Sequence, residues 1–332
     1  MNITLNGKSK VLSDTKTLRE TIEQTCKSTT PVIAELNGTI IKTPVWNQTS
    51  LKDGDVLELI NFVGGGQEPS ILNTRQDSPL TIAGKTFQSR FMLGTGKFKN
   101  KTDVTASILA SQTEIVTVAL RRIDIERHEE NILEYIPKNI TLLTNTSGAR
   151  NTEEAVRIAR LARESGCGNW VKIEVINDSK YLLPDNNKTI QATEILSAEG
   201  FVVLPYMYPD LYTARALVKA GAAAIMPLGS LIGSNQGLKT KEFLKILIDE
   251  IHDVPLVVDA GIGTPSQAAE AMEMGIDAVL ANTAVATAQN PEGLAKAFCL
   301  AVDAGRLAYL SGAPTIQSGA ETSSPLTNFL YQ

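Results

Sequence analysis

The stretch NWVKIEVI, residues 169–176, has the composition of a buried strand but carries Lys172 and Glu174 in its middle. Side chains alternate across a strand, so the two charged residues share one face and Val171 and Ile173 share the other. The aliphatic face suits packing against helices. The charged face then points into the interior of a closed sheet, which predicts a barrel with polar groups inside it.

Apolar runs of this kind recur through the chain after residue 80, each followed by a loop and an amphipathic segment. Such alternation indicates a parallel sheet covered on its faces by helices. Eight units in about 250 residues fit a (β/α)8 TIM barrel. A doubly wound open sheet is the alternative, but no GxGxxG follows the first strand, which favours the barrel. The runs are RFMLGT, EIVTVAL, TLLTNT, WVKIEV, FVVLPYM, AAIMPL, PLVVDA and AVLANT.

Residues 1–66 follow a different pattern. Asn-Gly pairs at positions 6–7 and 37–38 lie between alternating runs, which is a strong hairpin signal. Between them, residues 17–27 have helical spacing, with Leu18, Ile22 and Cys26 on one side. A last strand follows the Asp53-Gly54 turn. Two hairpins around one helix predict a small β-grasp (ubiquitin-like) domain, so the fold class is α/β, with this domain preceding the barrel.

Residues 67–79 are polar and lack periodicity, which is typical of a linker. We therefore expect a β-grasp domain over 1–66, a linker over 67–79 and a barrel over 80–332. The sequence TIAGKTF at the start of the barrel region predicts a short lid hairpin. Fully extended, the linker spans at most about 45 Å.

Composition excludes several classes of protein. The net charge is −5, which gives no general attraction to nucleic acid or to anionic membranes. No apolar run approaches the roughly 20 residues that span a bilayer. The chain has two histidines, so a histidine metal site or a Ser-His triad is not expected. Cys26, Cys167 and Cys299 show no CxxC spacing, which favours a reducing, cytoplasmic compartment.

Lys172 is the candidate nucleophile. A structural ion pair with Glu174 is the alternative, but buried ion pairs contribute little to stability because desolvation offsets the attraction. Burial is expected to lower the pKa of the Lys172 amine, so that more of it is free to form a Schiff base with a ketone. Glu174, on the same face, is placed to move protons on and off carbon.

Three successive loops follow the last three predicted strands, and the first two of them are rich in glycine. In PLVVDAGIGTPSQA, a flexible turn precedes the first residues of a helix, and the backbone N–H groups of such a turn bind anions. Phosphate sites after strands seven and eight are frequent in this fold. We therefore expect a phosphate ester substrate. The loops contain Gly233, Ala260, Gly261, Asn282 and Thr283.

Three charged residues on the same rim have two interpretations each. Asp259 closes the seventh predicted strand and either takes part in catalysis, which we prefer, or caps local backbone. Arg121 and Arg122 end the second strand and either contact an anion or form a solvated surface pair.

At these residues the sequence resembles a known family. The region from Leu80 onward resembles thiazole synthase of bacterial thiamin biosynthesis, and residues 1–66 resemble the thiamin sulfur carrier, a ubiquitin-like protein that ends in Gly-Gly. The barrel motifs are GKTFQSRFMLGTGKF, TEIVTVALRR, NWVKIEVI, FVVLPY, MPLGSLIGSNQGL, VVDAGIGTPSQAAEAMEMG, ANTAVA and AFCLAVDAGRLAY. The carrier motifs are LNG, LNGTII, Trp46 followed by LKDGD, and FVGGG.

The resemblance implies a reaction: condensation of 1-deoxy-D-xylulose 5-phosphate with dehydroglycine and thiocarboxylate sulfur, giving the thiazole phosphate carboxylate. It implies that Lys172 forms the Schiff base and that Glu174 and Asp259 are acid–base carboxylates. It implies that the reaction needs no metal and no organic cofactor. It also implies that the barrels associate as a homo-oligomer. It also implies a sulfur-loading adenylyltransferase that acts on the carrier terminus, Gly65-Gly66. The five loop residues above match the positions that hold the sugar phosphate.

Three features depart from the family pattern. Asn235 replaces a glycine in the sixth loop, where asparagine tolerates left-handed backbone. The stretch YMYPDLY, residues 206–212, is less acidic than usual. Gly66 is followed by Gln67, whereas a free carrier ends at this glycine.

Two other functions compete with this one. Another Schiff-base aldolase acting on a sugar phosphate explains Lys172 and the phosphate loops but not the β-grasp domain. A non-catalytic sulfur-carrier or docking module explains the small domain but not the charged strand.

Overall fold

The computed structural model describes residues 1–12, 17–26, 32–61, 77–120, 131–312 and 319. Two compact units contain nearly all of these residues, one with residues 1–61 and one with residues 77–312. Arg121, Arg122, Gly65 and Gly66 lie outside the described residues. Within the described ranges, no helix has the length and apolar character needed to cross a membrane.

The N-terminal unit is a five-stranded sheet with one helix, as the hairpin signals predict. The strand order is β2-β1-β5-β3-β4, with the parallel pair β1–β5 at its centre. Both Asn-Gly pairs adopt left-handed backbone in hairpin turns. Leu18 and Ile22 are buried in the core, and Cys26 packs against it. The elements are β1 (Asn2–Leu5), β2 (Lys8–Val11), α1 (Leu18–Thr25), β3 (Val32–Leu36), β4 (Thr39–Ile41), a 3-10 turn (Thr43–Val45) and β5 (Val56–Asn61).

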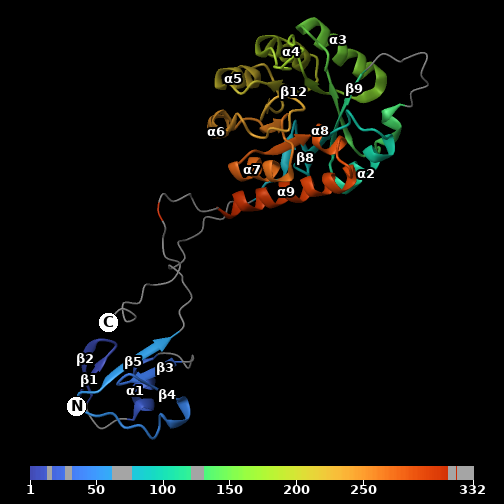
Figure 1. Cartoon of the computed structure of the whole chain (residues 1–332). Helices are drawn as coiled ribbons and strands as arrows, with labels where there is room; N and C mark the ends of the chain where they lie inside the picture. Colours follow the sequence, from blue (N-terminus) through green and yellow to red (C-terminus); the bar gives the residue numbers. More distant parts are fainter. Residues whose placement is uncertain (13–16, 27–31, 62–76, 121–130, 313–318, 320–332) are drawn as a thin grey trace. The chain divides into compact units, whose positions relative to one another are not determined.

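The second unit is an eight-stranded parallel barrel, which confirms the predicted fold (Figure 1). The hydrogen-bonded order is β13-β12-β11-β10-β9-β8-β15-β14. Parallel bridges from Ile225 to Leu256 and from Leu228 to Asp259 close the ring between β13 and β14. The strands are β8 (Phe91–Gly94), β9 (Ile115–Ala119), β10 (Thr141–Asn145), β11 (Trp170–Ile173), β12 (Val202–Met207), β13 (Met226–Pro227), β14 (Val257–Asp259) and β15 (Ala278–Ala281).

Helices surround the barrel, and their apolar residues pack against the outward faces of the strands. The C-terminal helix α9 packs against both α2 and α7. The helices are α2 (Lys101–Ser111), α3 (Thr152–Ala162) with a π-helical extension (Arg163–Cys167), α4 (Asn186–Ala198), α5 (Leu211–Lys219), α6 (Lys241–Glu250), α7 (Pro265–Met274), α8 (Thr283–Ala286) and α9 (Pro291–Ser311), with a 3-10 turn at Ile132–Tyr135.

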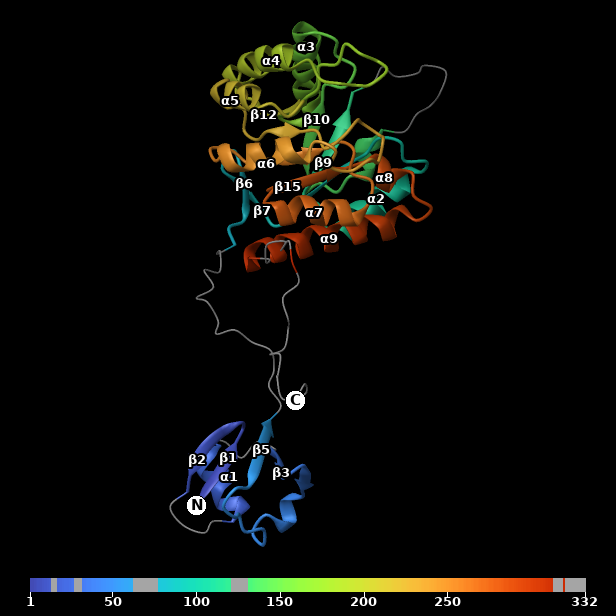
Figure 2. The same cartoon turned by 60° about the vertical axis from the view of Figure 1, so that its left-hand side comes forward.

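A short hairpin covers the N-terminal ends of the barrel strands (Figure 2). Its strands are β6 (Leu80–Ile82) and β7 (Lys85–Phe87). Leu80, Ile82 and Phe87 are buried against inward-facing side chains of the barrel. The hairpin predicted from TIAGKTF is thus confirmed, and it closes the end of the barrel opposite to the candidate site described below.

The first described residues of this unit are held at the same end. The Arg90 guanidinium donates to the carbonyl of Asp277, to the carbonyl of Ser78 and to Asp77 Oδ1. Arg306 of α9 donates to the same Asp77 oxygen at 3.0 and 3.1 Å. Residue 77 is therefore fixed beside the N-terminal ends of β8 and β15.

Candidate active site

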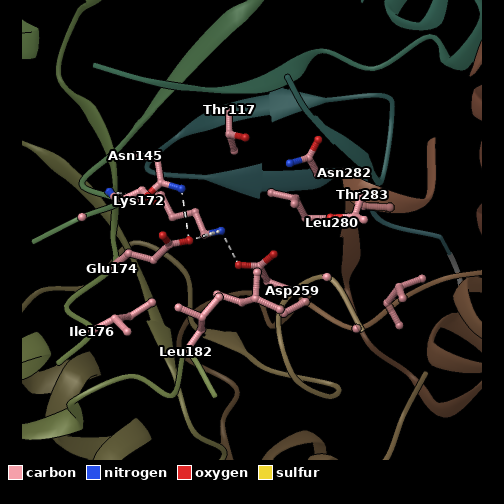
Figure 3. Close-up of a pocket in the computed structure, with 18 of the residues that line it drawn as sticks. Thr117, Asn145, Lys172, Glu174, Ile176, Leu182, Asp259, Leu280, Asn282 and Thr283 are labelled. Carbon is pink, nitrogen blue, oxygen red and sulfur yellow. Dashed lines mark hydrogen bonds and ion pairs between the residues drawn. The ribbon is translucent and has the colours of Figure 1, made fainter. Parts of the chain in front are cut away.

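The two faces of β11 separate as the alternation predicts. Val171, Ile173 and Val175 are buried against α3 and α4. Lys172 and Glu174 lie on the other face, inside the barrel, at the end of the strand (Figure 3). The Glu174 N–H donates to Thr146 Oγ1 at 2.8 Å, which ties the residue after β11 to the end of β10.

Asp259, at the end of β14, contacts Lys172, which lies on β11. Lys172 Nζ lies 3.1 Å from Glu174 Oε1 and also contacts Asp259 Oδ2, so it sits between the two carboxylates (Figure 3). The three residues are each no more than 5% exposed. One ammonium and two carboxylates in a closed site carry an excess negative charge.

The pKa of Lys172 is shifted in the opposite direction to the one that the sequence predicts. Burial does lower it, but attraction by Asp259 and then by Glu174 outweighs burial, and the pKa of Lys172 is raised. The prediction of a lowered pKa was wrong because it counted burial without the second carboxylate. Burial and repulsion by Glu174 raise the pKa of Asp259, against the attraction of Lys172. Asp259 is thus a suitable acceptor for the lysine's proton.

One cavity of about 470 Å³ contains every predicted site residue of the barrel. It opens at the carboxyl ends of the strands, where active sites of this fold are found. The cavity is lined by Lys172, Glu174, Asp259, Gly233, Ala260, Gly261, Asn282 and Thr283, with further residues from other loops.

The loops after β13 and β14 owe their shape to left-handed backbone. Gly233, Ala260 and Gly261 have φ of 72°, 72° and 79°. Asn235 has φ of 55°, which confirms that asparagine here occupies a glycine-like conformation. A non-glycine residue such as Ala260 in this region marks stored backbone strain, which is common at functional sites.

Gly261 also has no room for a side chain. A Cβ there would lie 1.8 Å from Ser230 Oγ and 2.7 Å from the backbone nitrogen of Ser230. A side chain at Gly261 would therefore collide with the neighbouring loop.

We therefore expect Gly261→Val to lower the free energy of unfolding by more than about 2 kcal/mol, as well as weakening ligand binding. Chemical denaturation measures this loss. Gly200→Val is the matched control, because Gly200 has φ of 80° but nothing within 4 Å of its Cβ position. Equal losses in both variants would show that backbone strain alone, and not the contact with Ser230, matters.

Sequence reasoning missed several residues of the site, among them Asn145 and Thr117. Asn145 Nδ2 donates to Glu174 Oε1 at 3.1 Å, and Thr117 lines the cavity from β9. Both are polar residues at or near the carboxyl end of a strand, which was a usable signal. The ring of Tyr206, buried in β12, lies 5.5 Å from Lys172 Nζ. No residue of the YMYPDLY stretch, Tyr206 included, lines the cavity.

Comparisons with known proteins show the family of the chain. The family described as thiazole biosynthesis protein ThiG matches residues 81–325, and the ThiS family matches residues 3–66. Thiazole synthase of Pelotomaculum thermopropionicum is 64% identical over 249 residues, which cover 75% of this chain and 97% of that protein. Thiazole synthase of Acetivibrio thermocellus is 63% identical over 254 residues, covering 76% and 99%.

Solved structures share the fold of the second unit. The crystal structure of the BexX/CysO complex of Amycolatopsis orientalis matches with a TM-score of 0.66 and 34% identity, over 74% of this chain and 100% of that chain. Mandelate oxidase matches with a TM-score of 0.51 and 17% identity, over 74% of this chain and 82% of that one, which shows the fold alone. The chain therefore belongs to the thiazole synthase (ThiG) family and carries, in the same polypeptide, an N-terminal domain of the ThiS family.

Proposed function

We propose that this thiazole synthase condenses 1-deoxy-D-xylulose 5-phosphate with dehydroglycine and carrier-bound thiocarboxylate sulfur, through an imine on Lys172. The observation that carries the proposal is the position of Lys172 Nζ between two buried carboxylates in a cavity at the carboxyl ends of the strands. Lys172 supplies the nucleophilic nitrogen, and the carboxylates of Glu174 and Asp259, which are in contact with it, can accept its proton.

The geometry suggests how the lysine becomes reactive. Its raised pKa means that Lys172 rests as an ammonium ion, so a proton has to leave before the nitrogen attacks the ketone carbon. Asp259, whose pKa is raised, accepts that proton. The amine and the ketone then form the imine and release water. Glu174, oriented by Asn145, moves protons on the neighbouring carbons.

The backbone of the loops after β13, β14 and β15 is proposed to hold the phosphate. Gly233, Ala260, Gly261, Asn282 and Thr283 line the same cavity as Lys172. The left-handed residues turn the backbone sharply there, and such turns present N–H groups to anions.

The N-terminal domain is proposed to carry sulfur at Gly65-Gly66, loaded by an adenylyltransferase. We keep the domain boundaries at residues 66 and 80 as a prediction, together with a homo-oligomer of the barrel. The three free cysteines favour a reducing compartment, and we propose the cytoplasm.

Borohydride trapping tests this function directly. Full-length protein is incubated with 1-deoxy-D-xylulose 5-phosphate, reduced, and digested for mass spectrometry. We expect the adduct on the peptide that contains Lys172. An absence of adduct would favour a docking module. An adduct without thiazole formation, when dehydroglycine and loaded carrier are supplied, would favour an aldolase.

The pH dependence of trapping is expected to depend on Asp259. Because attraction by the carboxylates raises the pKa of Lys172, the unprotonated fraction and the trapping rate should rise with pH above neutrality. Asp259→Asn removes one attracting charge, so the midpoint of this profile should move down by about one unit or more. Thiazole formation should fall as well, because the proton acceptor is lost.

Asp253→Asn is the control for this experiment, since Asp253 is exposed and lies before β14, at the other end of the barrel. A midpoint that stays in place or moves up in Asp259→Asn would contradict the electrostatic role of Asp259.

A further inference from the structure

The loop after β8 is tied to the loop after β15 through Asn282. In its hydrogen-bonding orientation, the Asn282 amide donates to the carbonyls of Gly96 at 2.7 Å and of Gly94 at 3.1 Å. A Cβ at Gly94 would lie 2.5 Å from that of Asn282, so the two loops approach closely only because position 94 is glycine. The path of residues 94–97 is therefore fixed beside the cavity.

Lys97 is placed over the proposed phosphate loops by this arrangement. It has left-handed backbone, with φ of 69°, which is unusual for a lysine. Its Nζ donates to Thr283 Oγ1 at 3.3 Å. A Cβ at Gly233 would lie 3.0 Å from the same Nζ. The ammonium group therefore lies between the loop after β13 and the first residue of α8.

The charges around the cavity leave Lys97 as an available cation. Lys172 is held by two carboxylates, and Arg150 is paired with Glu154 at 2.9 Å. In the part of the chain that the structure describes, Lys97 forms no ion pair; its hydrogen bond goes to a neutral hydroxyl. A phosphate ester carries nearly two negative charges and is bound most strongly by charge-assisted hydrogen bonds, for which lysine is a common donor.

We propose that Lys97 binds the phosphate of the substrate and makes the site selective for a phosphorylated ketose. This rests on the proposed function. Asn282 then acts as a positioning residue that fixes the Lys97 loop, in addition to lining the cavity. Asn282 and Thr283 lie on the far side of Lys172 from Glu174 (Figure 3), so the phosphate end of the substrate points toward β15 and the carbons that exchange protons point toward Glu174.

The test compares two ketoses in borohydride trapping by full-length protein: 1-deoxy-D-xylulose 5-phosphate and 1-deoxy-D-xylulose. Lys97→Gln should raise the half-saturating concentration of the phosphorylated ketose about tenfold or more, because it removes a charge-assisted hydrogen bond. The half-saturating concentration of the unphosphorylated ketose and both maximal trapping rates should not change. Lys97→Arg, which keeps the charge, should retain most of the preference for the phosphate.

Lys138→Gln is the matched control, since Lys138 is exposed and precedes β10, at the opposite end of the barrel. If Lys97→Gln and Lys138→Gln gave the same half-saturation for the phosphorylated ketose, the proposal would be overturned while the Schiff-base function stood. If the unmodified protein trapped neither ketose, the proposed function would fail. Calorimetry with inorganic phosphate then tests Lys97 alone: weaker binding by Lys97→Gln supports its role, and equal binding overturns it.

Discussion

Lys172→Ala is expected to abolish the borohydride-trapped adduct and to stop thiazole formation. The substitution removes the nitrogen that condenses with the ketone, and no other described lysine lies between two carboxylates in the cavity. Intact-mass spectrometry after reduction measures the adduct. Lys138→Ala, which changes an exposed lysine before β10, should trap substrate as the unmodified protein does.

The same variant should also be less stable, which gives a second readout. Without the ammonium, Glu174 and Asp259 face each other as buried, uncompensated charges, and breaking a buried pair costs about 3–5 kcal/mol. Burial already raises the pKa of Asp259, and loss of the lysine raises it further in the folded state, so stability should be recovered as the pH falls and Asp259 takes up a proton. Denaturant unfolding at pH 8 and pH 5 measures this difference.

Lys172→Arg separates the two effects. Guanidinium keeps a positive charge between the carboxylates but stays protonated, so it cannot form an imine. We expect most of the stability to return and no adduct to form. Trapping at undiminished rate in either variant would show that another residue is the nucleophile.

Cleavage after Gly66 is the second change with a large expected effect. In the carrier family that residues 1–66 resemble, sulfur loading begins at a free C-terminal carboxylate. Here the carboxyl group of Gly66 forms a peptide bond with Gln67 and cannot be adenylated. We propose that the chain is cut after Gly66 before the enzyme becomes active, which releases a carrier of 66 residues.

The anchor at Asp77 limits how far Gly66 can lie from the N-terminal ends of the barrel strands while the chain is uncut. Arg90 and Arg306 hold Asp77 at the N-terminal ends of the strands, whereas Lys172 lies in the cavity at their carboxyl ends. Ten residues separate Gly66 from this anchor, and ten extended residues span at most about 35 Å.

The expected result is two fragments in protein purified from its native host, the smaller ending at Gly66. Gln67→Pro should block most peptidases at this bond, so full-length protein should accumulate and thiazole formation should be lost. Addition of a free carrier that ends at Gly66 should restore it. Thr74→Pro, a proline elsewhere in the linker, is the control and should be processed normally. Full-length Gln67→Pro protein that still makes thiazole would show that cleavage is not required.

The sequence by itself determined the architecture, because that information is local. Period-two alternation placed Lys172 and Glu174 on one face of β11, and eight apolar runs with intervening helices gave the barrel. Asn-Gly pairs gave both hairpins of the N-terminal sheet. The peptide bond between Gly66 and Gln67 can be read directly from the order of the residues. Glycines in two successive loops identified the rim around Gly233 and Gly261.

Only the tertiary structure decided the electrostatics of the site. The pKa of Lys172 depends on which charges lie within a few ångströms, and ring closure brings Asp259 of β14 against a lysine of β11. The same closure sets Asn145 against Glu174, Lys97 against Thr283, and Asp77 against Arg306. Each pair joins residues from different elements, so no local pattern encodes it. A Coulomb interaction depends on distance in space, and the sequence gives only separation along the chain.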